Sequence, residues 1–234
     1  MSELSLSVRD ASRIDAAAME RLGIPGLLLM EHAALGVARI ARTEIAGYVR
    51  PRCTVLAGPG GNGGDGWAVA RLLHHGGVDV RVHHLGEPAA GTDAAINMRI
   101  ARSLGVPDEP IEPDRVPVDA ETLIVDAMFG VGLGRPLAGA AEAVARRVTA
   151  GDARVLAVDV PSGLDADAGT PLGPAIRADV TATMVAPKHG MLLPAARAWV
   201  GRIEIVDIGI PRDFVLQTVR LAESRPVGDT VQED

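Results

Sequence analysis

A glycine-rich segment, residues 58–66 (GPGGNGGDG), carries the first spacing that could do chemistry. Gly58, Gly60 and Gly63 form the pattern G-x-G-x-x-G between a predicted strand and a predicted helix, a context typical of nucleotide-binding loops. Glycines let backbone amides approach a ligand closely because no side chains intervene. The segment lacks the Gly-Lys-Ser/Thr ending of a phosphate-binding P-loop.

Asp65 near the end of this segment leaves two interpretations open. As a helix cap it would suit the helix dipole, although its carboxylate would repel a pyrophosphate placed beside it. Alternatively, Asn62 and Asp65 offer oxygens to a cation or to the hydroxyl groups of a ligand.

A second loop begins with Asp126 at the end of a predicted strand. Three alternate glycines follow, Gly130, Gly132 and Gly134, and then Arg135. A guanidinium beside such a loop can hold an anionic group through paired donors. The alternative is a tight strand-to-helix turn without a ligand.

A third loop contains Asp159, again at a predicted strand end, and Ser162 three residues later. The frame around Ser162 is not the G-x-S-x-G of a nucleophile elbow. Together with Asp65 and Asp126, Asp159 gives a set of carboxylates beside amide and hydroxyl oxygens, which favours a hard cation. The same carboxylates are candidates for general acid and base catalysis.

Histidines and the only lysine carry weaker signals. His74–His75 and His83–His84 are adjacent pairs whose members point apart on a helix or strand, so they do not predict a zinc site. Lys188 could contact a substrate, pair with a helix dipole or be a solvated side chain.

Short apolar runs alternate with helical patterns along most of the chain. We predict helices over 9–22, 27–46, 67–75, 93–104 and 138–148, and strands over 52–57, 78–83, 122–125, 155–158, 180–185 and 203–206. Residues 107–119 are expected to be a surface connection, and the tail 222–234 to be disordered. This alternation predicts an α/β fold, a Rossmann-like three-layer αβα sandwich with a mostly parallel central sheet. Ligand sites of such sheets lie outside the carboxyl ends of the strands, where the three loops belong.

Composition limits the function classes. The 234 residues carry 30 acidic and 23 basic side chains, a net charge of −7, and only 2% aromatic residues, which argues against nucleic-acid binding. Cys53 is the only cysteine, so no internal disulfide can form, and this fits a reducing compartment. We find no signal peptide and no membrane span, and expect a cytoplasmic protein.

At these loops the sequence resembles the YjeF N-terminal domain family, the NAD(P)H-hydrate epimerases. The matching segments are GIPGLLLMEHAA at 23–34, AGPGGNGGDGWAVARLL at 57–73, DAMFGVGLGRPL at 126–137, AVDVPSGLDADAG at 157–169, ADVTATMVAPKHGML at 178–192 and IEIVDIGIP at 203–211. The resemblance covers residues 8–212, so we expect one domain over 1–221.

The resemblance implies an activity and a set of site residues. The family epimerises the C6 carbon of hydrated NADH and NADPH (NADHX and NADPHX), commonly as a homodimer, and works with a separate or fused dehydratase. It implies that Asp159 contacts substrate, and because epimerisation needs a group that gives and takes a proton at oxygen, we expect Asp159 to be catalytic. It also implies a potassium ion held by Asn62, Asp126 and Ser162. The remaining substrate contacts it implies are Gly61, Asn62, Gly63, Gly64, Asp65, Gly130, Val131, Gly132, Leu133, Gly134, Arg135 and Pro136.

Two positions depart from the family pattern. Gly61 stands where the family has Asn, and His32 replaces Asn in the segment Met30–Ala33. Two other functions stay open: a non-catalytic nucleotide-binding or protein-interaction module on the same fold, and a dehydrogenase in which Glu87 would bind the ribose.

Overall fold

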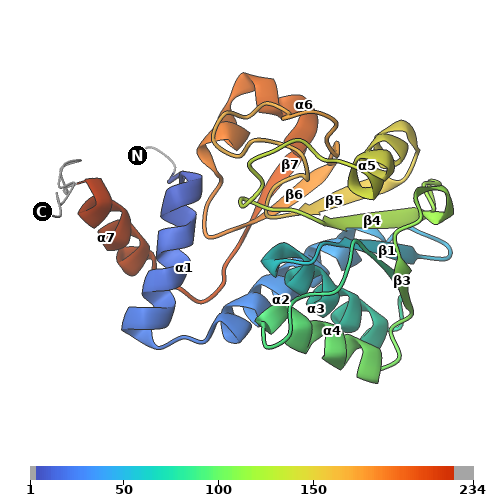
Figure 1. Ribbon diagram of the computed structural model, residues 1–234, viewed down its shortest axis with the longest axis horizontal. Helices are drawn as coiled ribbons and strands as arrows, with labels where there is room; N and C mark the ends of the chain where they lie inside the picture. The colour runs from blue at the N-terminus through green and yellow to red at the C-terminus, as the bar shows by residue number, and fades with distance from the viewer. Residues whose placement is uncertain (1–3, 224–234) are drawn as a thin grey trace, which may run out of the picture.

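The structure of this chain is a computed structural model that describes residues 4–223. Over these residues the chain forms a seven-stranded sheet in the order β3-β2-β1-β4-β5-β6-β7, with parallel pairing throughout. Helices cover both faces of the sheet (Figure 1). The predicted three-layer α/β sandwich is confirmed, and its sheet is fully parallel. No helix in the described part of the chain has the length and apolar character needed to cross a membrane.

The strands are β1 (Arg52–Ala57), β2 (Asp79–His84), β3 (Asp108–Pro110), β4 (Thr122–Ala127), β5 (Arg154–Val158), β6 (Val180–Met184) and β7 (Arg202–Val206). The helices are α1 (Val8–Leu22), α2 (Gly26–Glu44), α3 (Gly61–His75), α4 (Asp93–Ser103), α5 (Ala140–Ala150), α6 (Arg197–Val200) and α7 (Arg212–Glu223). Short 3-10 helices lie at η1 (Pro113–Arg115), η2 (His189–Leu192) and η3 (Pro194–Ala196).

Several elements differ from the sequence prediction: helices α6 and α7 were not predicted, and α5 begins and ends two residues later than predicted. Helix α3 begins at Gly61, so most of the glycine segment is helical, and the predicted start at Trp67 is wrong. The stretch 107–119 contains β3, which pairs with β2, in addition to η1. Helix α7 continues to Glu223, and the rest of the predicted tail lies outside the described residues.

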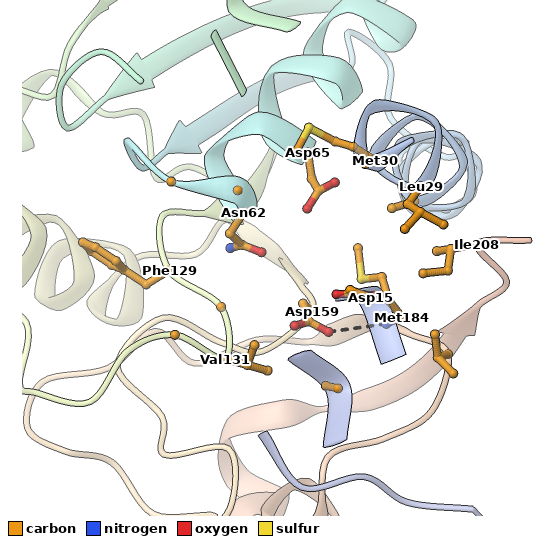
Figure 2. Close-up of a pocket in the computed structure, with 18 of the residues that line it drawn as sticks. Asp15, Leu29, Met30, Asn62, Asp65, Phe129, Val131, Asp159, Met184 and Ile208 are labelled. Atoms are coloured by element: carbon orange, nitrogen blue, oxygen red, sulfur yellow. Dashed lines mark hydrogen bonds between the residues drawn. The ribbon is translucent and has the colours of Figure 1, made fainter. Parts of the chain in front are cut away.

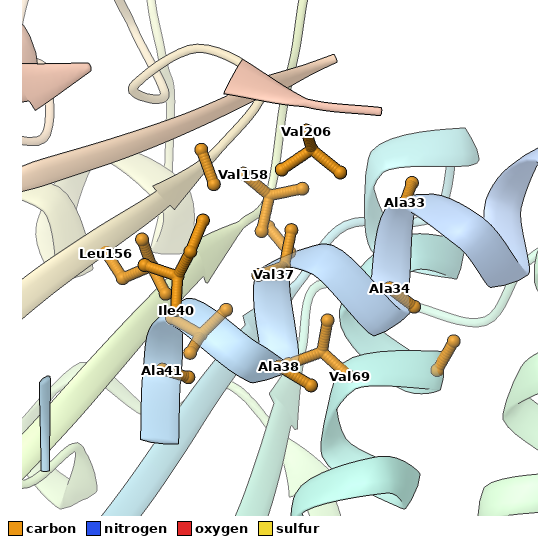
Figure 3. Close-up of a cluster of buried hydrophobic side chains, with 14 of the residues drawn as sticks. Ala33, Ala34, Val37, Ala38, Ile40, Ala41, Val69, Leu156, Val158 and Val206 are labelled. Carbon is orange, nitrogen blue, oxygen red and sulfur yellow. The ribbon is translucent and has the colours of Figure 1, made fainter. Parts of the chain in front are cut away.

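Alternate residues of the central strands face two different cores. Val55 of β1 packs under α2 and α3, whereas its neighbour Leu56 points to the opposite face, toward α5. Helix α2 packs against α3 through small side chains such as Ala38, which lies beside Val69, while Val37 points toward Val158 of the sheet (Figure 3). The approach is closest at Gly36, where a Cβ atom would lie 2.3 Å from Val206 Cγ1. Small residues therefore bring α2 directly onto the strands.

Helices α1 and α7 pack against each other beside the sandwich (Figure 1). The start of α1 is tied to the segment after β6, because Leu6 accepts a 2.9 Å hydrogen bond from the His189 amide and donates a 2.9 Å bond to the Pro187 carbonyl. The amide of Val8 also donates to Asp167 Oδ1 at 2.9 Å. These bonds fix the N-terminal helix relative to the carboxyl ends of the strands.

The centre of the sheet contains its topological switch point. The chain leaves β1 toward β2 on one side and leaves β4 toward β5 on the other, while β1 and β4 are neighbours. The loops after β1 and β4 diverge, and such a divergence is the usual ligand crevice of an open parallel sheet.

Candidate active site

A cavity of about 600 Å³ opens at this switch point. Its walls come from α1, α2 and the start of α3, and from the segments that follow β4, β5 and β6 (Figure 2). The predicted site residues that line it are Gly61, Asn62, Asp65, Gly130, Val131, Gly132, Leu133 and Asp159. Gly63 and Gly64 lie buried behind the first turn of α3, and Gly134, Arg135 and Pro136 are exposed outside the lining.

The glycines of residues 58–66 divide into two groups. A Cβ atom at Gly58 would lie 1.9 Å from the Met128 carbonyl oxygen, and one at Gly63 would lie 1.8 Å from that of Gly58. These two glycines allow the strand ends and α3 to touch. A Cβ atom at Gly60 or Gly61, in contrast, would meet nothing within 4 Å, and both residues border the cavity.

The N-terminus of α3 presents free backbone donors at the cavity. Gly60 is the N-cap, and no side chain caps the helix, so the first amides of the helix lack intrahelical acceptors. This arrangement favours an anionic group through both hydrogen bonds and the helix dipole. The interpretation of Asp65 as the cap is therefore wrong.

Asp65 instead faces the cavity from the second turn of α3 (Figure 2). Burial, with the nearby charges of Asp159 and Asp15 as lesser causes, raises the pKa of Asp65 well above its usual value. A raised pKa favours the neutral form of the carboxyl group, which can donate a hydrogen bond. The repulsion between Asp65 and a phosphate, which the sequence suggested, is thereby relieved.

Asp126 and Ser162 fasten the ends of β4 and β5 to each other. The Ser162 hydroxyl donates to Asp126 Oδ1 at 2.6 Å, the Ser162 amide donates to Asp126 Oδ2 at 2.8 Å, and the Phe129 amide donates to Ser162 Oγ at 2.9 Å. Both side chains are fully buried behind the cavity wall. Burial raises the pKa of Asp126 to about 6, although the hydrogen bonds from Ser162 and Met128 act in the opposite direction.

Asn62 connects this region to the cavity. Its Nδ2 atom is buried and has no hydrogen-bond partner among the described residues. A Cβ atom at Gly130 would lie 3.1 Å from Asn62 Oδ1 and 3.5 Å from Asp159 Oδ2. The first turn of α3 and the loops after β4 and β5 therefore converge at one point.

Asp159 is held by a buried ion pair with Lys188. The ammonium of Lys188 bonds to Asp159 Oδ1 and also donates to Thr183 Oγ1 at 2.9 Å. Lys188 is only 1% exposed, so its interpretation as a solvated side chain is wrong. Asp159 has a left-handed backbone with φ of 65°, a conformation that costs a non-glycine residue about 1–3 kcal/mol and is frequent at functional sites.

Sequence reasoning missed Asp15 of α1, which lines the same cavity. Its side chain is accessible to solvent inside the cavity, but the protein atoms packed around it and, to a smaller extent, the charge of Asp159 raise its pKa to about 6. Asp159, Lys188 and Asp65 all act on it electrostatically. The apolar spacing of residues 9–22 predicts the helix correctly and gives no sign that one of its acids faces the site.

Most of the residues that line this cavity lie in a part of the chain that matches a known protein family. Residues 26–190 match the family described as YjeF-related protein N-terminus. The chain belongs to this family. The matched range contains the glycine segment, the Asp126 and Asp159 loops and Lys188, but not Asp15.

Three relatives of this YjeF-related chain carry the same functional name. A protein of Levilactobacillus brevis named NAD(P)H-hydrate epimerase is 39% identical over 207 residues, covering 88% of this chain and 94% of the relative. Proteins with the same name from Oenococcus oeni (36% identity, 90% of this chain and 99% of the relative) and Pirellula staleyi (37%, 87% and 92%) also match. The crystal structure of yeast ynu0 shares the fold, with a TM-score of 0.75 and 24% identity, covering 92% of this chain and 93% of the yeast chain.

Proposed function

We propose that this chain is an NAD(P)H-hydrate epimerase, an isomerase that interconverts the R and S forms of hydrated NADH and NADPH at C6 as part of nicotinamide nucleotide repair. The observation that carries the proposal is the cavity at the switch point, where the Asp159 carboxylate is held by Lys188 beside the free amides of α3. A phosphate-binding helix end and a fixed proton acceptor are the two parts that such a reaction needs.

The substrate contacts divide by chemistry. The amides of Gly61, Asn62 and Gly63, at the start of α3, would bind the phosphates. The loop from Gly130 to Leu133, with Gly134, Arg135 and Pro136 following it, would enclose the dinucleotide, and Gly64 would contribute from the first turn of α3. Asp65, whose raised pKa favours the neutral form, would donate a hydrogen bond to a substrate oxygen.

Asp159 would transfer the proton at the reacting oxygen. The C6 hydroxyl of the hydrate is attached to the carbon next to the ring nitrogen, so the nitrogen lone pair can expel it as water and leave an iminium-like ring. Addition of water to the other face gives the second epimer. The alternative route opens the ring to an aldehyde and closes it again. Either route needs a carboxylate at the oxygen, and carboxylates also stabilise the positive charge that develops on the ring.

A potassium ion is proposed as the cofactor, with Asn62, Asp126 and Ser162 as its oxygen donors. The fit rests on the chemistry of the donor set: Asn62 Oδ1, which lies at the Gly130 loop, and the Asp126 carboxylate and Ser162 hydroxyl, which are bonded to each other at 2.6 Å, are oxygen donors that suit a hard cation. When bound, the ion would offset the charge of the buried Asp126 carboxylate and hold the loops together.

Potassium binding is tested by thermal unfolding in potassium chloride against choline chloride at equal ionic strength. We expect potassium to raise the unfolding temperature of the wild-type protein, and Asn62→Ala to remove that increase. An equal unfolding temperature in both salts would exclude a potassium site.

Two further partners follow from the proposed reaction. We propose that an epimer-specific dehydratase consumes the product of this chain. We also propose that the chain acts as a homodimer, for which the exposed apolar side chains Leu28 and Leu35 on α2 offer a surface. A reduced Cys53 fits a cytoplasmic location. Light scattering of the purified protein measures the oligomeric state.

The function is tested by supplying a mixture of both epimers of hydrated NADH to an epimer-specific dehydratase. The dehydratase alone is expected to stop when its own epimer is exhausted. With this protein added, consumption should continue until both epimers are gone. If the second epimer persists at the rate of uncatalysed exchange, the protein is a binding module and not an epimerase.

A further inference from the structure

Epimerisation by loss and addition of water involves both faces of the C6 carbon. The hydroxyl group leaves from one face, and the new water arrives on the other. A single carboxyl group would have to serve oxygen atoms on opposite sides of a ring. A site with two carboxyl groups in different positions can serve each face separately.

Asp15 supplies a second carboxyl group of this kind. It reaches the cavity from α1, whereas Asp159 follows β5, so the two carboxyl groups come from different elements, and Figure 2 draws both in the cavity. The carboxyl group of Asp15 makes no hydrogen bond or ion pair to another described residue, and its side chain is open to the cavity. The hydrogen bonds between Leu6 and the segment 187–189 hold α1 in register with the Lys188 segment that anchors Asp159. The placement of Asp15 is therefore fixed by the same segment that positions Asp159.

We propose that Asp15 is the second proton-transfer residue of the epimerase, acting on one face of the substrate ring while Asp159 acts on the other. This inference rests on the proposed function and names a residue outside the part of the chain that matches the family.

The reaction uses one proton, which the two carboxyl groups share. In one direction Asp15 gives its proton to the C6 hydroxyl, the C–O bond breaks with its electron pair on oxygen, and water leaves while the ring nitrogen lone pair forms a C=N bond. A water molecule then bonds to C6 from the other face, Asp159 takes its proton, and the C=N electrons return to nitrogen. The reverse reaction starts from protonated Asp159 and ionised Asp15. Two turnovers in the same direction require the proton to pass back from Asp159 to Asp15 or to solvent.

Asp15 suits this role better than Asp65 does. A group that alternately donates and accepts a proton works best with a pKa close to the working pH, and the pKa of Asp15 is about 6. Burial raises the pKa of Asp65 and favours its protonated form, which donates a hydrogen bond more readily than it accepts a proton. The positive charge of Lys188 lowers the pKa of Asp15, whereas it is not among the charges that shift the pKa of Asp65. The charged groups that face Asp15 are Asp65 of α3, Asp159 after β5 and Lys188 after β6.

The test compares Asp15→Asn with Asp15→Glu, Asp65→Asn and a control, Glu20→Gln, an exposed acid of the same helix. Initial rates are measured from each pure epimer between pH 5 and 9, and uncatalysed exchange is subtracted. We expect Asp15→Asn to lower kcat about 10²- to 10⁴-fold with a small change in KM. Asp15→Glu keeps a carboxyl group and should recover part of the lost kcat. Glu20→Gln should match the wild type.

The pH profile separates catalysis from a structural role. In the wild type, kcat/KM should fall as the pH rises above about 6, because the pair then loses its shared proton. This fall of kcat/KM at alkaline pH should be absent in Asp15→Asn and present in Asp65→Asn. An Asp15→Asn enzyme with an unchanged kcat and an unchanged fall of kcat/KM at alkaline pH would overturn the proposal. Loss of that fall in Asp65→Asn instead would also overturn it. A wild-type protein without epimerase activity would refute the proposed function itself.

Discussion

Ser162→Ala probes the bond network that joins the ends of β4 and β5. The substitution removes the 2.6 Å bond from the hydroxyl to the buried Asp126 carboxylate and leaves the Phe129 amide without its 2.9 Å acceptor. A hydrogen bond to a charged group contributes about 1.5–3 kcal/mol, and an unsatisfied buried donor costs about 1–3 kcal/mol. Allowing for local relaxation, we expect a loss of about 3 kcal/mol in the free energy of unfolding.

The assay is reversible thermal and urea unfolding followed by circular dichroism, in potassium-free buffer so that ion binding does not contribute. A chain of this size loses about 2–4 °C per kcal/mol, so the unfolding midpoint should fall by about 6–12 °C. The control is Ser12→Ala, because the exposed Ser12 hydroxyl bonds only to the Val8 carbonyl of its own helix at 3.1 Å. Equal midpoints for Ser162→Ala and the wild type would refute the role of this network.

Further predictions follow from the glycines, the cavity acids and the cysteine. Gly63→Ala should prevent stable folding or lower the unfolding temperature strongly, because its Cβ would lie 1.8 Å from a carbonyl oxygen; Gly61→Ala, with open space around it, should unfold like the wild type. The folded-state pKa of Asp15 is raised to about 6, so its stabilising effect is complete near pH 4 and is lost as the pH rises through 6. Asp15→Asn should therefore unfold at a higher temperature than the wild type at pH 8 and at the same temperature at pH 4, and a lower temperature at pH 8 would contradict this assignment. Burial raises the pKa of the Cys53 thiol to about 12, so a thiol reagent should react only as fast as the protein unfolds.

The fold was largely predictable because buried parallel strands leave a strong pattern. Most predicted strands agree with the structure to within two residues, as β1 and β7 illustrate. Strand β3 escaped prediction because its three residues are acidic or proline and pair only with β2. The start of α3 was misplaced because glycine has low helix propensity, whereas here tertiary packing at Gly58 and Gly63 selects the helical conformation.

The site was predictable where it follows the ends of strands. The positions of Asp159 and Asn62 at one cavity follow from the rule for parallel sheets. The roles of Lys188 and Asp15 were not accessible from the sequence. Lys188 meets Asp159 across 29 positions of the chain, and Asp15 reaches the cavity through the packing of α1, which follows the bridge between Leu6 and Lys188. Neither contact has a local pattern, since each depends on how separate elements pack.

The central claim, that this cavity epimerises hydrated NADH and NADPH through Asp159, is tested most directly by incubating one pure epimer with the wild type and with Asp159→Asn. Asn is a suitable replacement because it tolerates the left-handed backbone at this position. The wild type should bring either epimer to the same final mixture, as resolved by chromatography, while the folded Asp159→Asn protein exchanges them no faster than buffer does. Undiminished exchange by Asp159→Asn would contradict the account.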